Sequence, residues 1–161
     1  RYETVDQLAA ARYVASLPFV DPARIGIAGW SYGGYETLMC ATDAESTYAA
    51  AVAIAPVTSW RYYDTVYAER FMLTPGENAD GYDEGAPVNR AASLSCPLLI
   101  MHGTADDNVH LSNSIEFVCR LQQAHRYADM MLFPGMNHSI NGCDARAMVY
   151  GRMVDFFSRN L

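Results

Sequence analysis

The sequence predicts an α/β fold in which a mostly parallel sheet carries helices on both of its faces. Short, continuously apolar segments alternate along the chain with amphipathic stretches of helical period. This alternation is typical of a parallel sheet that is buried on both sides, because crossover helices cover it. At 161 residues, of which 51% are hydrophobic, the chain suits one compact domain that buries about 70% of its unfolded surface.

Two helices and two strands are expected in the N-terminal half. Thr4 begins a capping box, and apolar residues then recur at helical spacing until Pro18 ends the run. The predicted strands cover residues 24–28 and 50–55, and a helical run through residues 38–41 lies between them. Glycine or proline bounds each strand and limits its length.

The C-terminal half repeats the alternation after an irregular middle section. Residues 58–72 are rich in aromatic side chains and are predicted to form broken helix and loop. Residues 74–89 combine Pro, Gly, Asn and Asp at high density, which indicates a surface loop. Strands are predicted at 97–101 and 130–133, with a helix over 111–122 between them.

A final helix is expected to follow Asp144, whose side chain can cap it. Its predicted buried stripe consists of Met148, Val149, Met153, Phe156 and Phe157. We see no internal repeat, linker or domain boundary in the sequence. The fold class is therefore α/β, in a single unit over residues 1–161.

Composition and charge exclude several classes of function. Lys and Arg number 11 against 18 Asp and Glu, so the net charge is 11 − 18 = −7, which disfavours nucleic acid and anionic membranes as partners. No apolar run approaches the roughly 18 residues that a membrane-spanning helix needs. Small molecules and peptides remain as ligands.

The four cysteines predict no metal site. Cys40, Cys96, Cys119 and Cys143 lack C-x-x-C spacing, which argues against structural zinc. Cys40 and Cys119 fall in apolar helical stretches, where a buried thiol is expected. We predict no cofactor and no metal.

The turn after the first strand has the composition of a nucleophile elbow, Gly29-x-Ser31-x-Gly33. The turn from strand to helix is so tight that side chains flanking the serine would clash, and glycine avoids this. Such a turn exposes the Ser31 hydroxyl. It also places the backbone N–H of Tyr32 where it can stabilise an oxyanion at the start of a helix.

Loops after the third and fourth strands offer partners for this serine. A serine hydroxyl needs an imidazole to accept its proton, and the imidazole needs a carboxylate to fix its tautomer. Asp106 follows the third strand and His138 follows the fourth. This order of Ser, Asp and His, each after its own strand, is that of an α/β-hydrolase.

Other residues compete for both roles. His102 ends a buried strand and is predicted to be packed and hydrogen-bonded, His110 is placed to line the cleft, and His125 is expected in solvent. Asp106 is preferred to Asp107 because it lies nearer the strand end. The alternative for Asp107 is an Asx-turn or a capping carboxylate.

Three segments resemble the prolyl oligopeptidase family, and within it the catalytic domain of dipeptidyl peptidase IV. They are Gly29 to Tyr35 (GWSYGGY), Val57 to Tyr67, and His102 to His110 (HGTADDNVH). The resemblance runs from about Asp21 to the C-terminus. It implies a serine peptidase that releases N-terminal dipeptides with Pro or Ala before the cleaved bond.

Residue by residue, the resemblance implies that Ser31 is the nucleophile, Asp106 the orienting acid and His138 the base, with Tyr32 donating to the oxyanion. It implies that Asn108 helps to hold the substrate carbonyl. It also implies a pocket for the residue before the cleaved bond, with the walls Val57, Trp60, Tyr63, Tyr67 and Val109.

The aromatic pocket also has a physical rationale. Trp60, Tyr63 and Tyr67 recur at steps of three and four, so on a helix they would share one face. Flat aromatic walls suit a flat pyrrolidine ring. The alternative is that these side chains simply pack in the core, which is the usual meaning of such a stripe.

The resemblance also implies features that this sequence does not carry. Family members have a β-propeller before the hydrolase domain, and in dipeptidyl peptidase IV the propeller supplies the glutamates that hold the substrate amine. A second oxyanion donor, a tyrosine from an earlier strand, is missing here as well. The sequence is therefore expected to be the C-terminal portion of a catalytic domain. By analogy the full-length protein would be a homodimer that is periplasmic, secreted or membrane-associated.

Two other functions stay open from the sequence. The same three residues could serve an esterase or another acyl hydrolase, since acyl transfer does not depend on the leaving atom. An isolated portion of the domain could instead be an inert interaction module, because the last helix and a nearby strand take part in dimerisation in this family.

Overall fold

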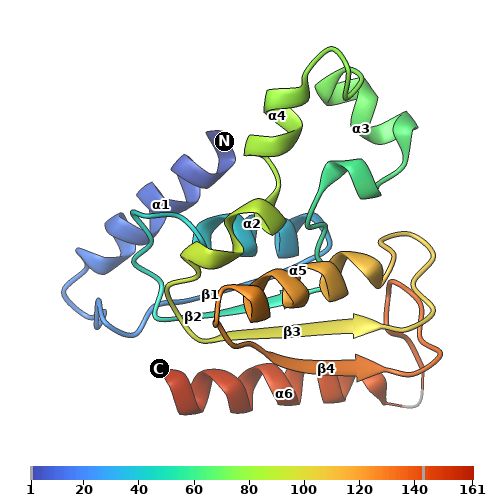
Figure 1. Cartoon of the computed structure of the whole chain (residues 1–161). Coiled ribbons are helices and arrows are strands. Elements are labelled where there is room, and N and C mark those ends of the chain that lie inside the picture. The colour runs from blue at the N-terminus through green and yellow to red at the C-terminus, as the bar shows by residue number, and fades with distance from the viewer. Residues whose placement is uncertain (1, 143) are drawn as a thin grey trace.

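The computed structural model, which describes residues 2–142 and 144–161, is a parallel sheet between two layers of helices (Figure 1). The strands are β1 (Gly26–Trp30), β2 (Ala50–Ile54), β3 (Leu98–Gly103) and β4 (Asp129–Phe133). They lie in that order across the sheet, and each neighbouring pair is parallel. The carboxyl ends of all these strands therefore meet at one edge of the sheet.

Helices cover both faces, as expected for this class. The helix α6 (Ala145–Asn160) lies against one face. The other face carries α2 (Tyr32–Ala41), α5 (Ser112–Gln123) and the 3₁₀ segment η2 (Pro87–Ser93), and α1 (Tyr2–Ala15) packs on α2. The shorter elements η1 (Trp60–Tyr62), α3 (Thr65–Met72) and α4 (Ala79–Glu84) lie away from the sheet (Figure 1).

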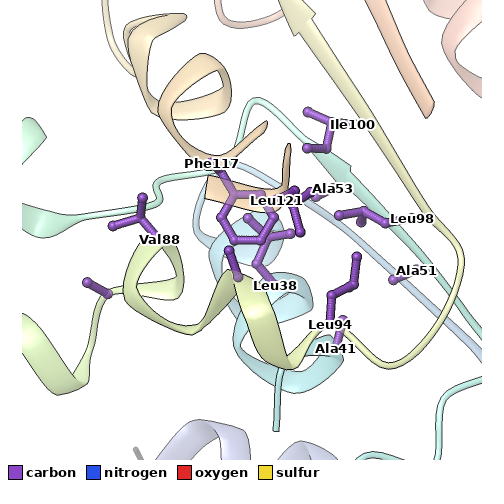
Figure 2. Packing of buried hydrophobic residues seen from close by; sticks show 12 residues of the cluster. Leu38, Ala41, Ala51, Ala53, Val88, Leu94, Leu98, Ile100, Phe117 and Leu121 are labelled. Atoms are coloured by element: carbon purple, nitrogen blue, oxygen red, sulfur yellow. The ribbon is translucent and has the colours of Figure 1, made fainter. Parts of the chain in front are cut away.

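The two central strands supply both halves of the core. In β2, Ala51 and Ala53 face α2 and α5, whereas Val52 and Ile54 face α6. In β3 the side chains alternate in the same way. Figure 2 shows the first of these clusters, in which Phe117 of α5 packs among leucines and alanines. Burial on both faces explains why these strands are continuously apolar.

The region predicted as a surface loop, residues 74–89, is instead largely ordered as α4 and the start of η2. Its turn-forming residues act as helix caps, since the Asn78 side chain accepts a hydrogen bond from the Gly81 N–H. Tyr82 is buried and donates its hydroxyl hydrogen to the Leu73 carbonyl. The prediction was wrong because capping and turn residues are the same residue types.

Two predicted caps are also wrong. The helix α1 already begins at Tyr2, and Thr4 is a buried residue within it whose hydroxyl donates to Glu36 Oε2 at 3.4 Å. Asp144 does precede α6, but it has a left-handed backbone and its side chain makes no capping hydrogen bond.

The helical periodicity misplaced some side chains. Met148 is about half exposed, although Val149 and Phe156 of the same predicted stripe are buried. Cys40 is buried as expected, but Cys119 is exposed, and Cys143 lies outside the described residues. In α5 the buried face is formed by Asn113, Ser114, Phe117 and Leu121. Within the described ranges, no helix is long and apolar enough to cross a membrane.

Candidate active site

Ser31 occupies the sharp turn between β1 and α2 and has an unusual backbone, with φ of 60° and ψ of −116°. A non-glycine residue in such a region costs about 1–3 kcal/mol and persists only when its surroundings hold it. Here the Ser31 N–H donates to the Ile54 carbonyl at 2.8 Å, and the Ser31 carbonyl accepts from the Tyr35 N–H at 3.0 Å. The turn is thus fixed to both β2 and α2.

Close backbone approach explains two of the glycines around this turn. A Cβ atom at Gly29 would collide with the Gly33 carbonyl, and one at Gly34 would lie 2.9 Å from the Ile54 carbonyl oxygen. A Cβ at Gly33 would meet nothing within 4 Å. The sequence prediction that Gly33 avoids a clash is therefore wrong, and the helix-side glycine that the packing requires is Gly34.

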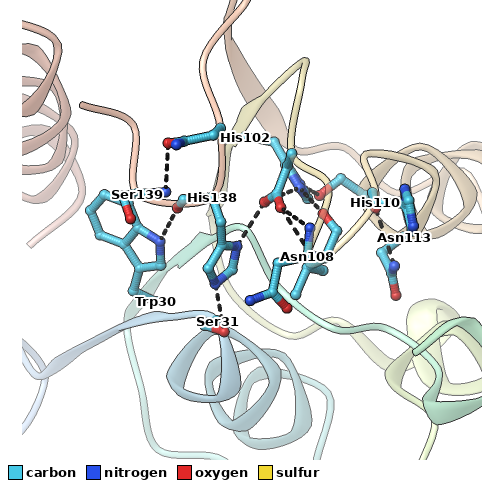
Figure 3. Close-up of polar contacts among 12 residues, drawn as sticks. Trp30, Ser31, His102, Asn108, His110, Asn113, His138 and Ser139 are labelled. Atoms are coloured by element: carbon cyan, nitrogen blue, oxygen red, sulfur yellow. Dashed lines mark hydrogen bonds and ion pairs between the residues drawn. The ribbon is translucent and has the colours of Figure 1, made fainter. Parts of the chain in front are cut away.

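The structure brings Ser31, Asp106 and His138 into one hydrogen-bonded row (Figure 3). His138 Nδ1 lies 2.7 Å from Asp106 Oδ2, and His138 Nε2 lies 2.9 Å from Ser31 Oγ. A carboxylate only accepts hydrogen bonds, so Nδ1 of the neutral imidazole carries the proton. Nε2 is then a free acceptor that faces the serine hydroxyl, the tautomer that a general base requires.

The Asp106 carboxylate is fully enclosed, and both of its oxygens are held. Oδ1 accepts from the backbone N–H groups of Asn108 at 3.0 Å and Val109 at 2.9 Å. Oδ2 faces His138 Nδ1 and also lies 3.2 Å from His102 Nε2. Asp106 itself therefore forms the Asx-turn that was offered as the alternative for Asp107, which is exposed.

The loop that carries His138 is held against the ends of β1 and β3. A Cβ at Gly103 would collide with the Met136 carbonyl, so only glycine lets this loop approach β3 so closely. The Trp30 indole N–H donates to the His138 carbonyl at 2.9 Å. Sequence reasoning missed both contacts, although the glycine directly after His102 was a usable signal for a close approach.

The other histidines are placed largely as predicted. His102 is completely buried, with Nδ1 2.7 Å from Ser114 Oγ and Nε2 2.8 Å from the Val109 carbonyl. Burial lowers the pKa of His102, so this imidazole is neutral near pH 7. His110 lines a surface hollow with Tyr63 and Asn108, and His125 is exposed.

Tyr32 is the first residue of α2, so its backbone N–H has no acceptor within the helix. This N–H follows Ser31 directly in the chain. The Tyr32 side chain is partly exposed, and burial together with the charge of Glu3 raises the pKa of its hydroxyl. The hydroxyl is therefore neutral at physiological pH.

The aromatic side chains near the site form one contacting group, but not on a single helix. Trp60 lies in η1, Tyr63 has an extended backbone just after it, and Tyr67 lies in α3. The three side chains therefore share no single helix face, and the prediction of broken helix and loop over residues 58–72 is confirmed. Tertiary packing still brings the rings together, with centroids 5.7 Å apart for Trp60 and Tyr67 and 5.5 Å apart for Tyr63 and Tyr67.

These predicted pocket residues divide into buried and accessible ones. Val57, Trp60 and Val109 are buried in one cluster, so they also support the core. Tyr63 is half-buried and its hydroxyl donates to Asn108 Oδ1 at 2.6 Å, while Tyr67 is more exposed. The core-packing interpretation therefore holds for Val57, Trp60 and Val109, whereas Tyr63 and Tyr67 remain accessible.

A hollow of about 950 Å³ opens beside the site. Its wall includes Tyr32, Trp60 and Tyr67, and it continues towards α1 and α4. Its lining does not include Ser31 or His138, so the serine lies next to the hollow rather than in it. Tyr32, adjacent to Ser31 in the chain, connects the two.

A second polar network that the sequence did not suggest supports the aromatic wall. Asn113 and Thr58 are both fully buried, and the Asn113 side-chain oxygen accepts from the Thr58 N–H at 2.9 Å. The Thr58 hydroxyl donates to the Asn113 carbonyl at 2.8 Å. These bonds fix the segment that leads into η1 onto the start of α5. In the sequence, the signal for this network was the presence of polar residues in the amphipathic helix α5.

Among the residues that the structure describes, no group of three or more His, Cys, Asp or Glu side chains is arranged to hold a metal ion. The polar groups at the carboxyl edge of the sheet are instead paired with one another. The arrangement presents a hydroxyl, an acceptor imidazole and a buried carboxylate, which is what acyl transfer requires.

Comparisons with known proteins agree with this geometry. Residues 1–161 match the family described as "Prolyl oligopeptidase family". The chain is 45% identical over 159 residues to the "Probable dipeptidyl-aminopeptidase B" of Paracoccidioides brasiliensis (strain Pb18), a match that covers 96% of this chain and 17% of that protein. A protein of the same description from Grosmannia clavigera is 47% identical over 157 residues, with 96% of this chain and 16% of the relative covered.

A solved structure is also closely similar. The crystal structure of Porphyromonas gingivalis dipeptidyl peptidase 4 superposes with a TM-score of 0.97 and 49% sequence identity, over 99% of this chain and 23% of that one. The expected α/β-hydrolase fold is thereby confirmed. The chain spans about 17% of the length of the curated relatives that it matches.

Proposed function

The chain belongs to the prolyl oligopeptidase family, and from this we propose that it carries the nucleophile, base and orienting acid of a dipeptidyl peptidase IV-type serine peptidase. The substrates would be peptides with Pro or Ala before the cleaved bond. The observation that carries the proposal is the row from Ser31 through His138 to Asp106, with the imidazole tautomer fixed by the buried carboxylate.

In this mechanism Ser31 Oγ attacks the substrate carbonyl carbon while His138 Nε2 takes the hydroxyl proton. Asp106 holds the imidazole and stabilises its positive charge. The Tyr32 backbone N–H donates to the oxyanion of the tetrahedral intermediate. The imidazolium then gives its proton to the leaving amine, which leaves an acyl-enzyme. Water, deprotonated by His138, hydrolyses this ester and restores Ser31.

The aromatic group beside Ser31 supports the preference for proline. Trp60 and Tyr67 are nearly stacked, with an interplanar angle of 27°, and Tyr63 stands edge-on to both. Val57 and Val109 are buried in the same cluster as Trp60, against which Tyr63 packs. A pyrrolidine ring is compact and apolar, so it would gain from contact with such walls. Asn108, next to Tyr63, would hold a substrate carbonyl.

The experiment compares turnover of a Gly-Pro anilide with that of short acyl esters by the full protein and by Ser31→Ala. We expect anilide cleavage in the wild type and a fall in kcat of at least about 10⁴-fold in the variant. Activity above a tenth of wild type in Ser31→Ala would show that Ser31 is not the nucleophile. Ester turnover without anilide turnover would assign the site to an esterase.

A further inference from the structure

His102 is a completely buried histidine that the mechanism above does not use. It stands near the end of β3, paired in register with Leu132 of β4. Its ring touches three polar groups, namely Ser114 Oγ, the Val109 carbonyl and Asp106 Oδ2. In Figure 3, His102 lies further from Ser31 than His138 does, beyond the imidazole of His138.

The contacts fix where the His102 proton lies. The Val109 carbonyl oxygen only accepts hydrogen bonds, so the nitrogen 2.8 Å from it, Nε2, must carry the hydrogen. Nδ1 is then the acceptor for the Ser114 hydroxyl at 2.7 Å. Nε2 also lies 3.2 Å from Asp106 Oδ2, so its N–H faces the carboxylate while its hydrogen bond goes to the Val109 carbonyl.

We propose that His102 is a positioning residue of this site, which holds the Asp106 carboxylate in the orientation that His138 requires. The inference rests on the proposed function. His102 acts at two points of the 106–109 loop, because Nε2 donates to the Val109 carbonyl and faces Asp106 Oδ2. The loop is also closed on itself, since Asp106 Oδ1 accepts from the Val109 N–H. Removing His102 would leave Oδ2 with His138 as its remaining side-chain partner and would free one carbonyl of the loop.

The burial of His102 suits this role. The titratable groups that face it are Asp106 and His138, and burial opposes protonation of His102 beside them. A neutral ring presents its N–H dipole to Oδ2 without adding a positive charge that would compete with the imidazolium formed during catalysis. Ser114, which is also fully buried, fixes the ring by donating to its other nitrogen.

The test compares His102→Leu, His102→Gln and Ser114→Ala in the full protein, with Ser31→Ala as the reference for loss of the nucleophile. We expect His102→Leu to lower kcat about 10- to 100-fold, because the carboxylate loses a polar partner and the loop loses a hydrogen bond, with KM almost unchanged. His102→Gln, whose amide can donate from a similar position, should recover most of the loss. Ser114→Ala keeps the donor to Asp106 and should cost only a few-fold.

The pH dependence of kcat/KM distinguishes a positioning role from a general loss of structure. The part of the profile that matters is the acid limb, where kcat/KM falls as the pH is lowered. Without the His102 donor, the Asp106 carboxylate attracts the imidazolium proton more strongly, so the neutral base is lost at higher pH. We expect the limb to move up by about half a unit in His102→Leu and to return in His102→Gln. Partial unfolding would lower the amplitude of the profile without moving this limb.

The rate constant for labelling of Ser31 by a fluorophosphonate provides a second readout, since it reports only folded molecules. If His102→Leu folds poorly, His102→Met, with its flexible apolar side chain, is measured in the same way. Slower labelling in the folded fraction supports the proposal. An unmoved acid limb and a wild-type labelling rate in either apolar variant would overturn it. Activity that survives Ser31→Ala would instead overturn the proposed function, and the role of His102 with it.

Discussion

The indole nitrogen of Trp30 donates a hydrogen bond of 2.9 Å to the backbone carbonyl of His138, 108 residues further along the chain. Trp30 directly precedes Ser31, so the residue beside the hydroxyl also holds the loop that carries the imidazole. The guanidinium of Arg146 lies 5.3 Å from the indole ring and covers it from α6. The distance between Ser31 and His138 is thus set partly by the side chain of Trp30, the last residue of β1.

Trp30→Phe removes this hydrogen bond while it keeps an aromatic ring beside Arg146. We expect kcat to fall about 5-fold, equivalent to roughly 1 kcal/mol, with KM unchanged, because only the placement of His138 is altered. Steady-state kinetics on a Pro anilide measure this. The exposed variant Tyr150→Phe on α6 is the matched control. A wild-type kcat in Trp30→Phe would contradict the positioning role.

Asp106→Asn and Asp107→Asn test which of two neighbouring carboxylates orients His138. The Asp106→Asn variant would present an amide to His138 and disturb the tautomer, so kcat should fall by about 10⁴-fold. Asp107 is exposed, and Asp107→Asn should remain close to wild type. The same kinetic assay measures both. The reverse ranking would move the orienting role to Asp107.

The two adjacent glycines of the turn should respond differently to alanine. Gly34→Ala places a methyl group 2.9 Å from the Ile54 carbonyl, which should shift the turn and abolish most activity. Gly33→Ala adds a methyl group in open space within α2 and should raise the free energy of unfolding by up to about 1 kcal/mol. Urea unfolding and fluorophosphonate labelling check the pair. Equal damage in both variants would contradict this account of the turn.

Tyr67→Ala tests the aromatic wall better than a change at Trp60, because Trp60 is buried in the core. We expect kcat/KM to fall about 10-fold more for Pro than for Ala substrates, since the larger ring loses more apolar contact. Phe71, whose ring is 5.1 Å from that of Tyr67, is more exposed, so Phe71→Ala serves as the control. Equal losses on both substrates would mean that Tyr67 only supports the fold.

Glu36 predicts a dependence of stability on pH. It is buried in α2, and its Oε1 has no hydrogen-bond partner among the described residues. Burial, followed by the charge of Glu3, raises the pKa of Glu36 above the ordinary value of 4.5. As pH rises from 4.5 through this raised pKa, the unfolded chain has lost a proton that the folded state still holds, so stability falls.

Glu36→Gln replaces the buried charge by a neutral amide, so it should raise the free energy of unfolding at pH 7 by about 1 kcal/mol, because the cost of desolvating the carboxylate is removed. The gain should disappear below pH 4.5, where Glu36 is protonated in both states. Urea unfolding at several pH values measures it. Glu45→Gln, at an exposed carboxylate, should change little at any pH. A gain that does not depend on pH would show that the charge of Glu36 is not the cause.

The sequence by itself determined the α/β class, the four apolar strands and the residues Ser31, Asp106 and His138 at their carboxyl ends. These features are local, because hydrophobic period and turn chemistry act between residues a few positions apart. The same local signals failed at residues 74–89, where caps and turns use the same residue types.

Only the tertiary structure decided how these elements meet. The hydrogen bond from Trp30 to His138 and the contact between His102 and Asp106 depend on how loops pack. So does the meeting of the aromatic rings of Trp60, Tyr63 and Tyr67, which come from separate elements. Which glycine the turn requires depends in the same way on a carbonyl of the neighbouring strand β2. Such contacts join residues distant along the chain, and no period or spacing encodes them, since burial and close approach arise only when the layers come together.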